Sequence, residues 1–131
     1  MHEKRLPDAE LEVMKALWDA DQPLTRTQLE ERLAGHNWAS TTLLALLARL
    51  EAKGCVSRSR QGRGYLYHAA LSRKDYLPVE SRSALSRLFA GSAKNLIAAM
   101  AESDDLTDRD IDELEEYLSR LKAGRGGTHR D

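Results

Sequence analysis

Three arginines have the chemistry and the spacing to hold phosphate groups. Arg58 and Arg60 lie two positions apart in a segment rich in strand-favouring residues, so their side chains are expected to point to the same side. Arg63 follows in a glycine-containing turn. A guanidinium donates hydrogen bonds in a planar fork that matches phosphate oxygens. These residues predict contact with a phosphate backbone; the alternative is an exposed hairpin that charge keeps soluble.

The other reactive side chains do not predict a catalytic or metal centre. No two of the four histidines have the spacing of metal ligands: His2, His36, His68 and His129. The single cysteine, Cys55, precedes a valine and is interpreted as a small buried hydrophobe, and it excludes an intramolecular disulfide. The acidic residues 104–112 lack the glycine and the closing glutamate of a calcium loop. We therefore expect no enzyme activity, no metal and no cofactor.

Helical periodicity predicts three helices ahead of the arginines. Apolar residues recur at helical spacing over residues 8–20, and Thr25 and Gln28 have the form of a capping box for a second helix that ends at Gly35. A third helix is expected from residue 39 or 40 to residue 53, with Gly54 after it. Its buried stripe comprises Leu43, Leu46, Leu47 and Leu50.

The opposite face of the third helix is small and almost uncharged, whereas a solvated helix normally places Lys and Glu there. We predict that this face enters the major groove of DNA, where short side chains allow close approach to the bases. Thr41 is the first candidate for reading a base, and Arg49 for anchoring a phosphate. The alternative is that this face packs on another protein. The residues predicted to contact DNA are Ser40, Thr41, Thr42, Leu44, Ala45 and Arg49, together with Arg58, Arg60 and Arg63.

Two short segments, residues 55–60 and 65–69, predict a hairpin around a Gly-containing turn at residues 61–64. Three helices followed by an arginine-bearing hairpin are the order of a winged helix-turn-helix. The predicted fold is mainly α with a small β-hairpin wing, and we assign residues 1–72 to a winged helix-turn-helix DNA-binding domain.

From residue 73 the pattern is helical again and predicts a dimerisation domain over residues 73–123, followed by a flexible tail at 124–131. Near its end, four apolar residues recur with a 3-4-3 spacing that is typical of paired helices. A small DNA-binding module also needs two copies to cover a useful site. The predicted dimerisation residues are Leu85, Leu88, Phe89, Leu96, Ile97, Met100, Ile111, Leu114, Leu118 and Leu121.

The charge of the 131-residue chain is divided between these two parts. The formal net charge is −1, but residues 49–74 carry seven bases and one acid, whereas residues 102–116 carry nine acids and one base. The near-neutral total therefore does not exclude DNA as a partner. The charged N-terminal segment does not read as a signal peptide, and no window is apolar enough to insert in a membrane, so we expect a cytoplasmic protein.

Over about residues 6–121, the chain resembles the penicillinase-repressor (BlaI/MecI) family of winged-helix transcriptional repressors. The resemblance is carried by three spaced motifs and by the start of the last helix. These are Asp8-Ala9-Glu10-Leu11-Glu12-Val13-Met14 with Leu17-Trp18-Asp19; Trp38 with Thr42-Leu43, Leu46-Leu47, Arg49-Leu50 and Lys53-Gly54; Gly62-Arg63-Gly64-Tyr65-Leu66-Tyr67; and Leu106-Thr107 with Asp110-Ile111-Asp112-Glu113-Leu114.

The resemblance implies a homodimeric repressor that binds a pseudo-palindromic operator, often with TACA/TGTA cores, upstream of a β-lactamase or similar stress gene. Such repressors are typically inactivated by cleavage in the dimerisation region, linked to a membrane-bound sensor metallopeptidase. The Asn-Phe pair at which the family is cleaved corresponds to Ala99-Met100 in this sequence. Because the residues at the cleavage position differ, the inducer need not be a β-lactam. The C-terminal cysteine pair of the copper-responsive relatives is absent. Two other functions stay open: a regulator released by a small molecule bound around Tyr76, Leu88 and Phe89, and a winged-helix protein-interaction module.

Overall fold

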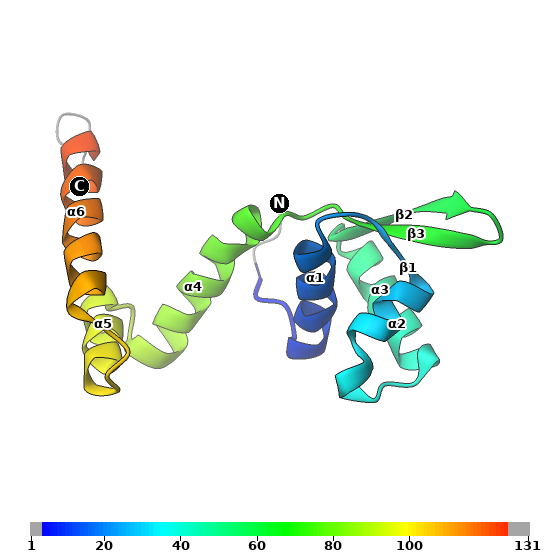
Figure 1. Ribbon diagram of the computed structural model, residues 1–131, viewed down its shortest axis with the longest axis horizontal. Coiled ribbons are helices and arrows are strands. Elements are labelled where there is room, and N and C mark those ends of the chain that lie inside the picture. Colours follow the sequence, from blue (N-terminus) through cyan, green and yellow to red (C-terminus); the bar gives the residue numbers. More distant parts are fainter. Residues whose placement is uncertain (1–3, 126–131) are drawn as a thin grey trace. The chain divides into compact units, whose positions relative to one another are not determined.

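The computed structural model describes residues 4–125 and is mainly helical, with one small sheet (Figure 1). The chain divides into two compact units, residues 1–84 and residues 85–131. The first unit extends beyond residue 72, where the sequence placed the boundary. The reason is that Tyr76 and Val79, in the first turns of helix α4 (Arg73–Phe89), are buried with the core of the first unit.

The first unit begins with the three expected helices: α1 (Asp8–Ala20), α2 (Arg26–Arg32) and α3 (Ser40–Ala52). A capping box starts α2, because the Gln28 amide donates to the Thr25 hydroxyl while the Thr25 amide donates to the Gln28 side chain. A short 3₁₀ helix, η1 (Ala34–His36), follows α2. Gly54, at φ +81°, allows the chain to leave α3 and enter the hairpin.

The sheet has three antiparallel strands in the order β1-β3-β2: β1 (Leu24–Thr25), β2 (Val56–Gln61) and β3 (Gly64–Ala69). The hairpin of β2 and β3 is the predicted wing. Its register pairs Arg58 with Tyr67 and Arg60 with Tyr65. Strand β1 was not predicted from the sequence. It has only two residues beside a proline, and its pairing of Leu24 with Tyr67 is set by the tertiary fold.

The core of the first unit is formed mainly by leucines. All four members of the predicted α3 stripe, Leu43, Leu46, Leu47 and Leu50, are buried. They belong to one hydrophobic cluster with residues of α1 and α2, which include Val13, Met14, Leu17 and Leu29. Cys55 is also buried, as expected, and burial raises the pKa of its thiol. The buried stripe fixes which face of α3 points outward.

Buried polar groups in the first unit are paired. Glu10, on α1, is 3% exposed and accepts a hydrogen bond from the ammonium of Lys53 at the end of α3. The Tyr76 hydroxyl accepts from the Leu6 amide (2.8 Å) and donates to Glu80 (2.7 Å). These contacts tie α3 to α1, and the N-terminal segment to α4.

The second unit contains the end of α4 with α5 (Ala93–Glu102) and α6 (Asp108–Arg125). Gly91, at φ +80°, lies between α4 and α5. Thr107 and Asp110 form a reciprocal capping box at the start of α6. Helix α6 continues through Gly124 to Arg125, where the sequence had placed the start of a tail; a basic residue in the last turn is favourable to the helix dipole. The rest of the predicted tail, residues 126–131, lies outside the described residues.

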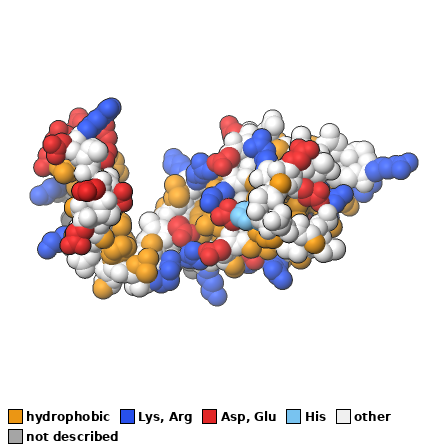
Figure 2. Space-filling view, turned by 60° about the horizontal axis from the view of Figure 1, so that its bottom comes forward, with side chains coloured by type: hydrophobic (Ala, Val, Ile, Leu, Met, Phe, Trp, Pro, Cys, Tyr) orange, Lys and Arg blue, Asp and Glu red, His pale blue; other side chains and the backbone are white. Residues whose placement is uncertain are grey.

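The second unit exposes apolar side chains beside its acidic residues (Figure 2). Among its described residues, α5 and α6 contain no buried side chain. Leu88, Tyr117 and Leu118 are each more than half exposed. Over residues 4–125, no helix has both the length and the apolar character that a membrane span requires.

Candidate nucleic-acid interface

The face of α3 opposite its leucine stripe is exposed along its whole length. We call it the outer face, and it comprises Ser40, Thr41, Thr42, Leu44, Ala45, Ala48 and Arg49. Leu44 is 42% exposed, although it is a large apolar residue. Arg49 is the only charged member of this face. The geometry therefore presents a helix surface of hydroxyls, methyl groups and one guanidinium.

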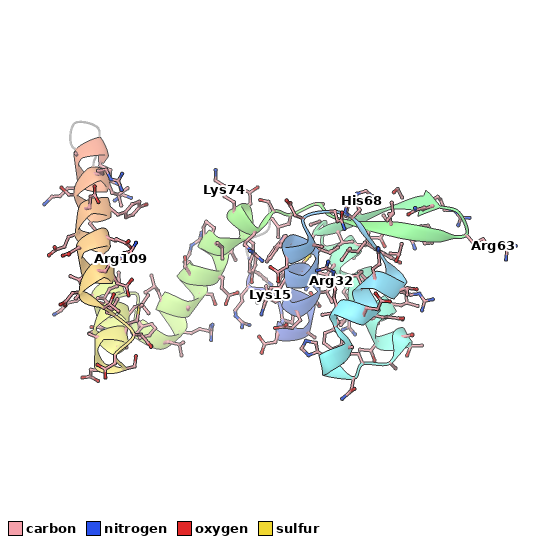
Figure 3. All side chains as sticks on the ribbon, in the orientation of Figure 1. Lys15, Arg32, Arg63, His68, Lys74 and Arg109 are labelled. Carbon is pink, nitrogen blue, oxygen red and sulfur yellow. The ribbon has the colours of Figure 1, made fainter. Side chains whose placement is uncertain are left out.

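The wing carries its arginines in two different settings. Arg63 lies at the tip of the hairpin and extends away from the rest of the unit (Figure 3). It has no hydrogen bond or ion pair with any described residue, so its donors are available to a ligand. Arg58 donates to Glu51 of α3 (3.0 Å), and its guanidinium lies 4.3 Å from the centroid of the Tyr65 ring.

Arg60 contacts the same tyrosine as Arg58, as expected for two residues that point to one side of a strand. Its guanidinium lies 5.2 Å from the Tyr65 ring centroid and donates to the Tyr65 hydroxyl at 3.4 Å. This hydrogen bond, with the positive charges of Arg58 and Arg60, lowers the pKa of Tyr65. The face of the wing that carries Arg58, Arg60 and Tyr65 therefore bears two positive charges beside the carboxylate of Glu51, and the net positive charge suits a polyanionic ligand.

A groove of about 650 Å³ lies between the wing, α3 and the start of α2. It brings Leu44 of the outer face together with Arg58 and Arg63 of the wing. Several residues that line it were not among those predicted to contact DNA: Thr25, Arg26, Thr27, Gln61, Tyr65 and Tyr67. The capping box of Thr25 and Gln28 predicted the start of α2. Arg26 and Thr27 come directly after its N-cap, and this position is the signal in the sequence that could have identified them.

The first turn of α3 is connected to α2 by a side-chain network centred on Glu30. The Ser40 hydroxyl donates to Glu30 Oε2 (2.7 Å), and the same oxygen accepts from Arg26 (3.0 Å). The side chains of Thr41 and Thr42 have no such partner among the described residues. Arg49 likewise has no hydrogen bond or ion pair with the described residues, whereas Glu51, two positions further on, binds Arg58.

The predicted dimerisation residues differ in their exposure. Half-exposed side chains alternate with more covered ones along α6: Ile111 (41%) and Leu118 (55%) are exposed, whereas Leu114 and Leu121 are intermediate. Leu88 is 66% exposed and Ile97 is 37% exposed. The side chains of four other predicted residues are partly buried: Leu85, Phe89, Leu96 and Met100. Tyr117, which is 54% exposed next to Leu118, was not among the predicted dimerisation residues. Ala99 and Met100 both lie within α5.

A metal centre is not formed by the described residues. No group of three or more metal-ligating side chains comes together between residues 4 and 125. His68 instead shares a hydrogen bond with Ser59 across the wing (3.0 Å).

Comparison with known proteins decides the family of this fold. The family model described as penicillinase repressor matches residues 6–120, which is most of the chain. The chain belongs to the penicillinase repressor family. Among curated members it is 32% identical over 122 residues to the penicillinase repressor of Bacillus licheniformis, covering 91% of this chain and 95% of that protein. It is 24% identical to the methicillin resistance regulatory protein MecI of Mammaliicoccus sciuri, covering 88% and 94%.

Solved structures agree with the winged-helix architecture. The solution structure of the DNA-binding domain of the repressor BlaI is 28% identical, with a TM-score of 0.51; it covers 58% of this chain and 93% of that chain. Apo MarR from E. coli, at 18% identity and a TM-score of 0.50, covers 88% and 77% and supports the fold alone. Membership in the penicillinase repressor family places the chain among repressors and not among enzymes.

Proposed function

We propose that this penicillinase-repressor family member is a homodimeric transcriptional repressor that binds a pseudo-palindromic DNA operator. Its relatives are named for the repression of penicillinase and the regulation of methicillin resistance. Genes for resistance to β-lactams, or related stress genes, are accordingly its proposed targets. Because chromosomal DNA is the proposed partner, the protein would act in the cytoplasm.

The observation that carries this proposal is the groove between α3 and the wing. A nearly uncharged, exposed helix face stands beside a hairpin with three arginines, and Leu44, Arg58 and Arg63 line the same concavity. A helix without long side chains can approach base edges closely, while guanidinium groups bind the flanking phosphates. A surface that only kept the protein soluble would not separate uncharged and cationic residues in this way.

The residues of the outer face and the arginines of the wing receive proposed roles from their settings. Thr41 and Thr42, whose hydroxyls are free of protein partners among the described residues, would read bases, and Leu44 and Ala45 would contact thymine methyl groups. Arg49 and Arg63 would bind phosphates directly. Arg58 and Arg60, stacked on Tyr65, would provide positive charge, and Arg58 would also hold the wing against α3 through Glu51.

The second unit is proposed to form the dimer. Its described helices α5 and α6 contain no buried side chain, although they carry Ile97, Ile111, Tyr117 and Leu118 at 37% exposure or more. Helices this short gain most of their stability from packing an apolar face. A second copy of the chain would supply that packing, and two copies would place two α3 helices on the two halves of an operator.

Release from DNA is proposed to follow cleavage between Ala99 and Met100 by a membrane sensor metallopeptidase. The bond lies inside α5, and a helical segment must unwind before a peptidase can hold it in an extended form. Within one copy of the chain α5 buries no side chain, so its unwinding would break contacts across the proposed dimer and not contacts of the core. Mass spectrometry of the protein from induced cells tests this step: fragments that end at Ala99 support it, and an intact chain in derepressed cells refutes it.

An electrophoretic shift with the DNA upstream of the protein's own gene tests the DNA-binding proposal. At low salt we expect a discrete complex that weakens as salt rises, because binding releases counterions from the phosphates. No complex at low salt would contradict the proposal and favour a protein-interaction module. Saturable release of bound DNA by a small molecule would instead indicate the ligand-sensing alternative.

A further inference from the structure

Ser40 differs from the two threonines that follow it in the first turn of α3. All three hydroxyls are exposed, but only the Ser40 hydroxyl has a protein partner among the described residues: it donates to Glu30 Oε2 at 2.7 Å. A hydroxyl has one hydrogen to donate and two lone pairs that accept, whereas an ionised carboxylate can only accept. Glu30 therefore uses the one hydrogen that the Ser40 hydroxyl can donate and leaves the lone pairs of that oxygen free to accept.

A second contact keeps the Glu30 carboxylate in place. Arg26, one turn earlier on α2, donates to the same oxygen at 3.0 Å. This guanidinium also balances the negative charge of Glu30, which would otherwise repel a phosphate backbone close to α3. The network explains how a carboxylate can lie beside a surface that would face DNA.

We infer that the side chain of Ser40 acts only as a hydrogen-bond acceptor toward DNA and selects a base that presents an exocyclic amino group in the major groove. The inference rests on the proposed function and deepens it. In the major groove such groups are N6 of adenine and N4 of cytosine, which donate, whereas phosphate oxygens and O6 and N7 of guanine only accept. The Ser40 hydroxyl thus has no hydrogen left to donate to a phosphate. Glu30 is a positioning residue that acts through Ser40.

The spacing of α3 supports a base contact from this residue. Ser40 and Leu44 are four positions apart and share one side of the helix, and Leu44 lines the groove to the wing. In helix-turn-helix proteins the N-terminal residues of the recognition helix contact base edges. Ser40 is the first residue of α3 and belongs to that turn.

Selection from a duplex DNA library with a randomised central segment tests the inference. The wild-type protein is compared with Ser40→Ala, Glu30→Gln and Glu31→Gln. The last is a matched control, because Glu31 is an exposed carboxylate on the same helix that has no partner among the described residues. The side-chain amide introduced by Glu30→Gln can donate to the Ser40 oxygen, so this variant changes the hydrogen-bonding role of Ser40 while keeping the size of the side chain.

At one position of each half-site, we expect the wild type and Glu31→Gln to prefer adenine or cytosine over a base without the amino group. The preference should be about fivefold, which corresponds to the net free energy of one hydrogen bond. In Ser40→Ala and Glu30→Gln this preference should fall below about twofold, with the other positions unchanged. If the wild type enriches no sequence from the library, the proposed function itself is contradicted. If the wild type enriches a sequence but Glu30→Gln and Glu31→Gln show the same base preference, only the role of Glu30 and Ser40 is overturned.

Deleting the amino group from the selected base gives an independent measurement. In one half-site of the selected duplex, adenine is replaced by purine, or cytosine by 2-pyrimidinone, so that one exocyclic amine is lost from the base that the protein reads. Wild-type binding should weaken about fivefold, whereas binding by Ser40→Ala should not change further, because the two deletions remove one interaction. Equal weakening of both proteins would overturn the assignment to Ser40.

Discussion

Replacing Arg63 by alanine should change the salt dependence of DNA binding in a calculable way. Arg63 has no partner among the described residues and lies at the tip of the wing, so its loss removes a phosphate contact without leaving another group unpaired (Figure 3). Each phosphate contact contributes a slope of about 0.9 to the dependence of log affinity on log salt. A dimer has two copies of Arg63, and the slope should therefore decrease by about 1.8.

The decrease is large enough to measure by fluorescence anisotropy with one labelled operator. Between about 50 mM and about 200 mM salt, the wild type should lose about twelvefold more affinity than the variant. Lys74→Ala is the matched control: Lys74 is an exposed cation of the same unit without a partner among the described residues, and it lies well apart from Arg63 in Figure 3. An unchanged slope for Arg63→Ala, or equal slopes for both variants, would refute the assignment of the wing tip to the phosphates.

Three further substitutions test the dimer, the core and the buried tyrosine. Leu118→Glu, at a site that is 55% exposed, should shift the protein from dimer to monomer in sedimentation, whereas Ser119→Glu should not; a dimeric Leu118→Glu would show that this seam is not the interface. Lys53→Met should lower the free energy of unfolding in urea by about 1–3 kcal/mol, because it leaves the Glu10 carboxylate buried without its partner; an unchanged midpoint would contradict that pairing. Burial raises the pKa of Tyr76 from 10.0 to about 12, so the stability that its neutral hydroxyl contributes is complete below pH 10 and is lost as the pH rises to 12. Tyr76→Phe should be less stable at neutral pH and lose less stability over that alkaline range; parallel curves would contradict this role.

Local patterns were sufficient to predict the three helices and the hairpin of the first unit. Leu43, Leu46, Leu47 and Leu50 recur at helical spacing, and their burial determines which residues form the outer face. The capping box at Thr25 follows from the residue types three positions apart, and it was confirmed. These features depend on contacts within one turn or one helix, which is the range that sequence periodicity reports.

The contacts that connect different elements could not be predicted in this way. Ser40 meets Glu30 only because η1 and the loop after it fold α3 back beside α2. Arg58 meets Glu51 because the hairpin returns along α3, so a residue expected to bind phosphate is partly occupied by a carboxylate. Such pairings depend on where whole elements pack, and residue type alone does not specify them.

DNA cleavage by a reagent attached to α3 tests the central claim, that the outer face enters the major groove. Cys55, the one native cysteine, is 1% exposed, so Ala48→Cys offers a single accessible thiol for an iron chelate, with Ser119→Cys on α6 as control. The account predicts that the Ala48→Cys conjugate cuts operator DNA at two clusters separated by about 10 base pairs or a multiple of that, one in each half-site. Cutting by the Ser119→Cys conjugate alone, or at positions without half-site symmetry, would contradict it.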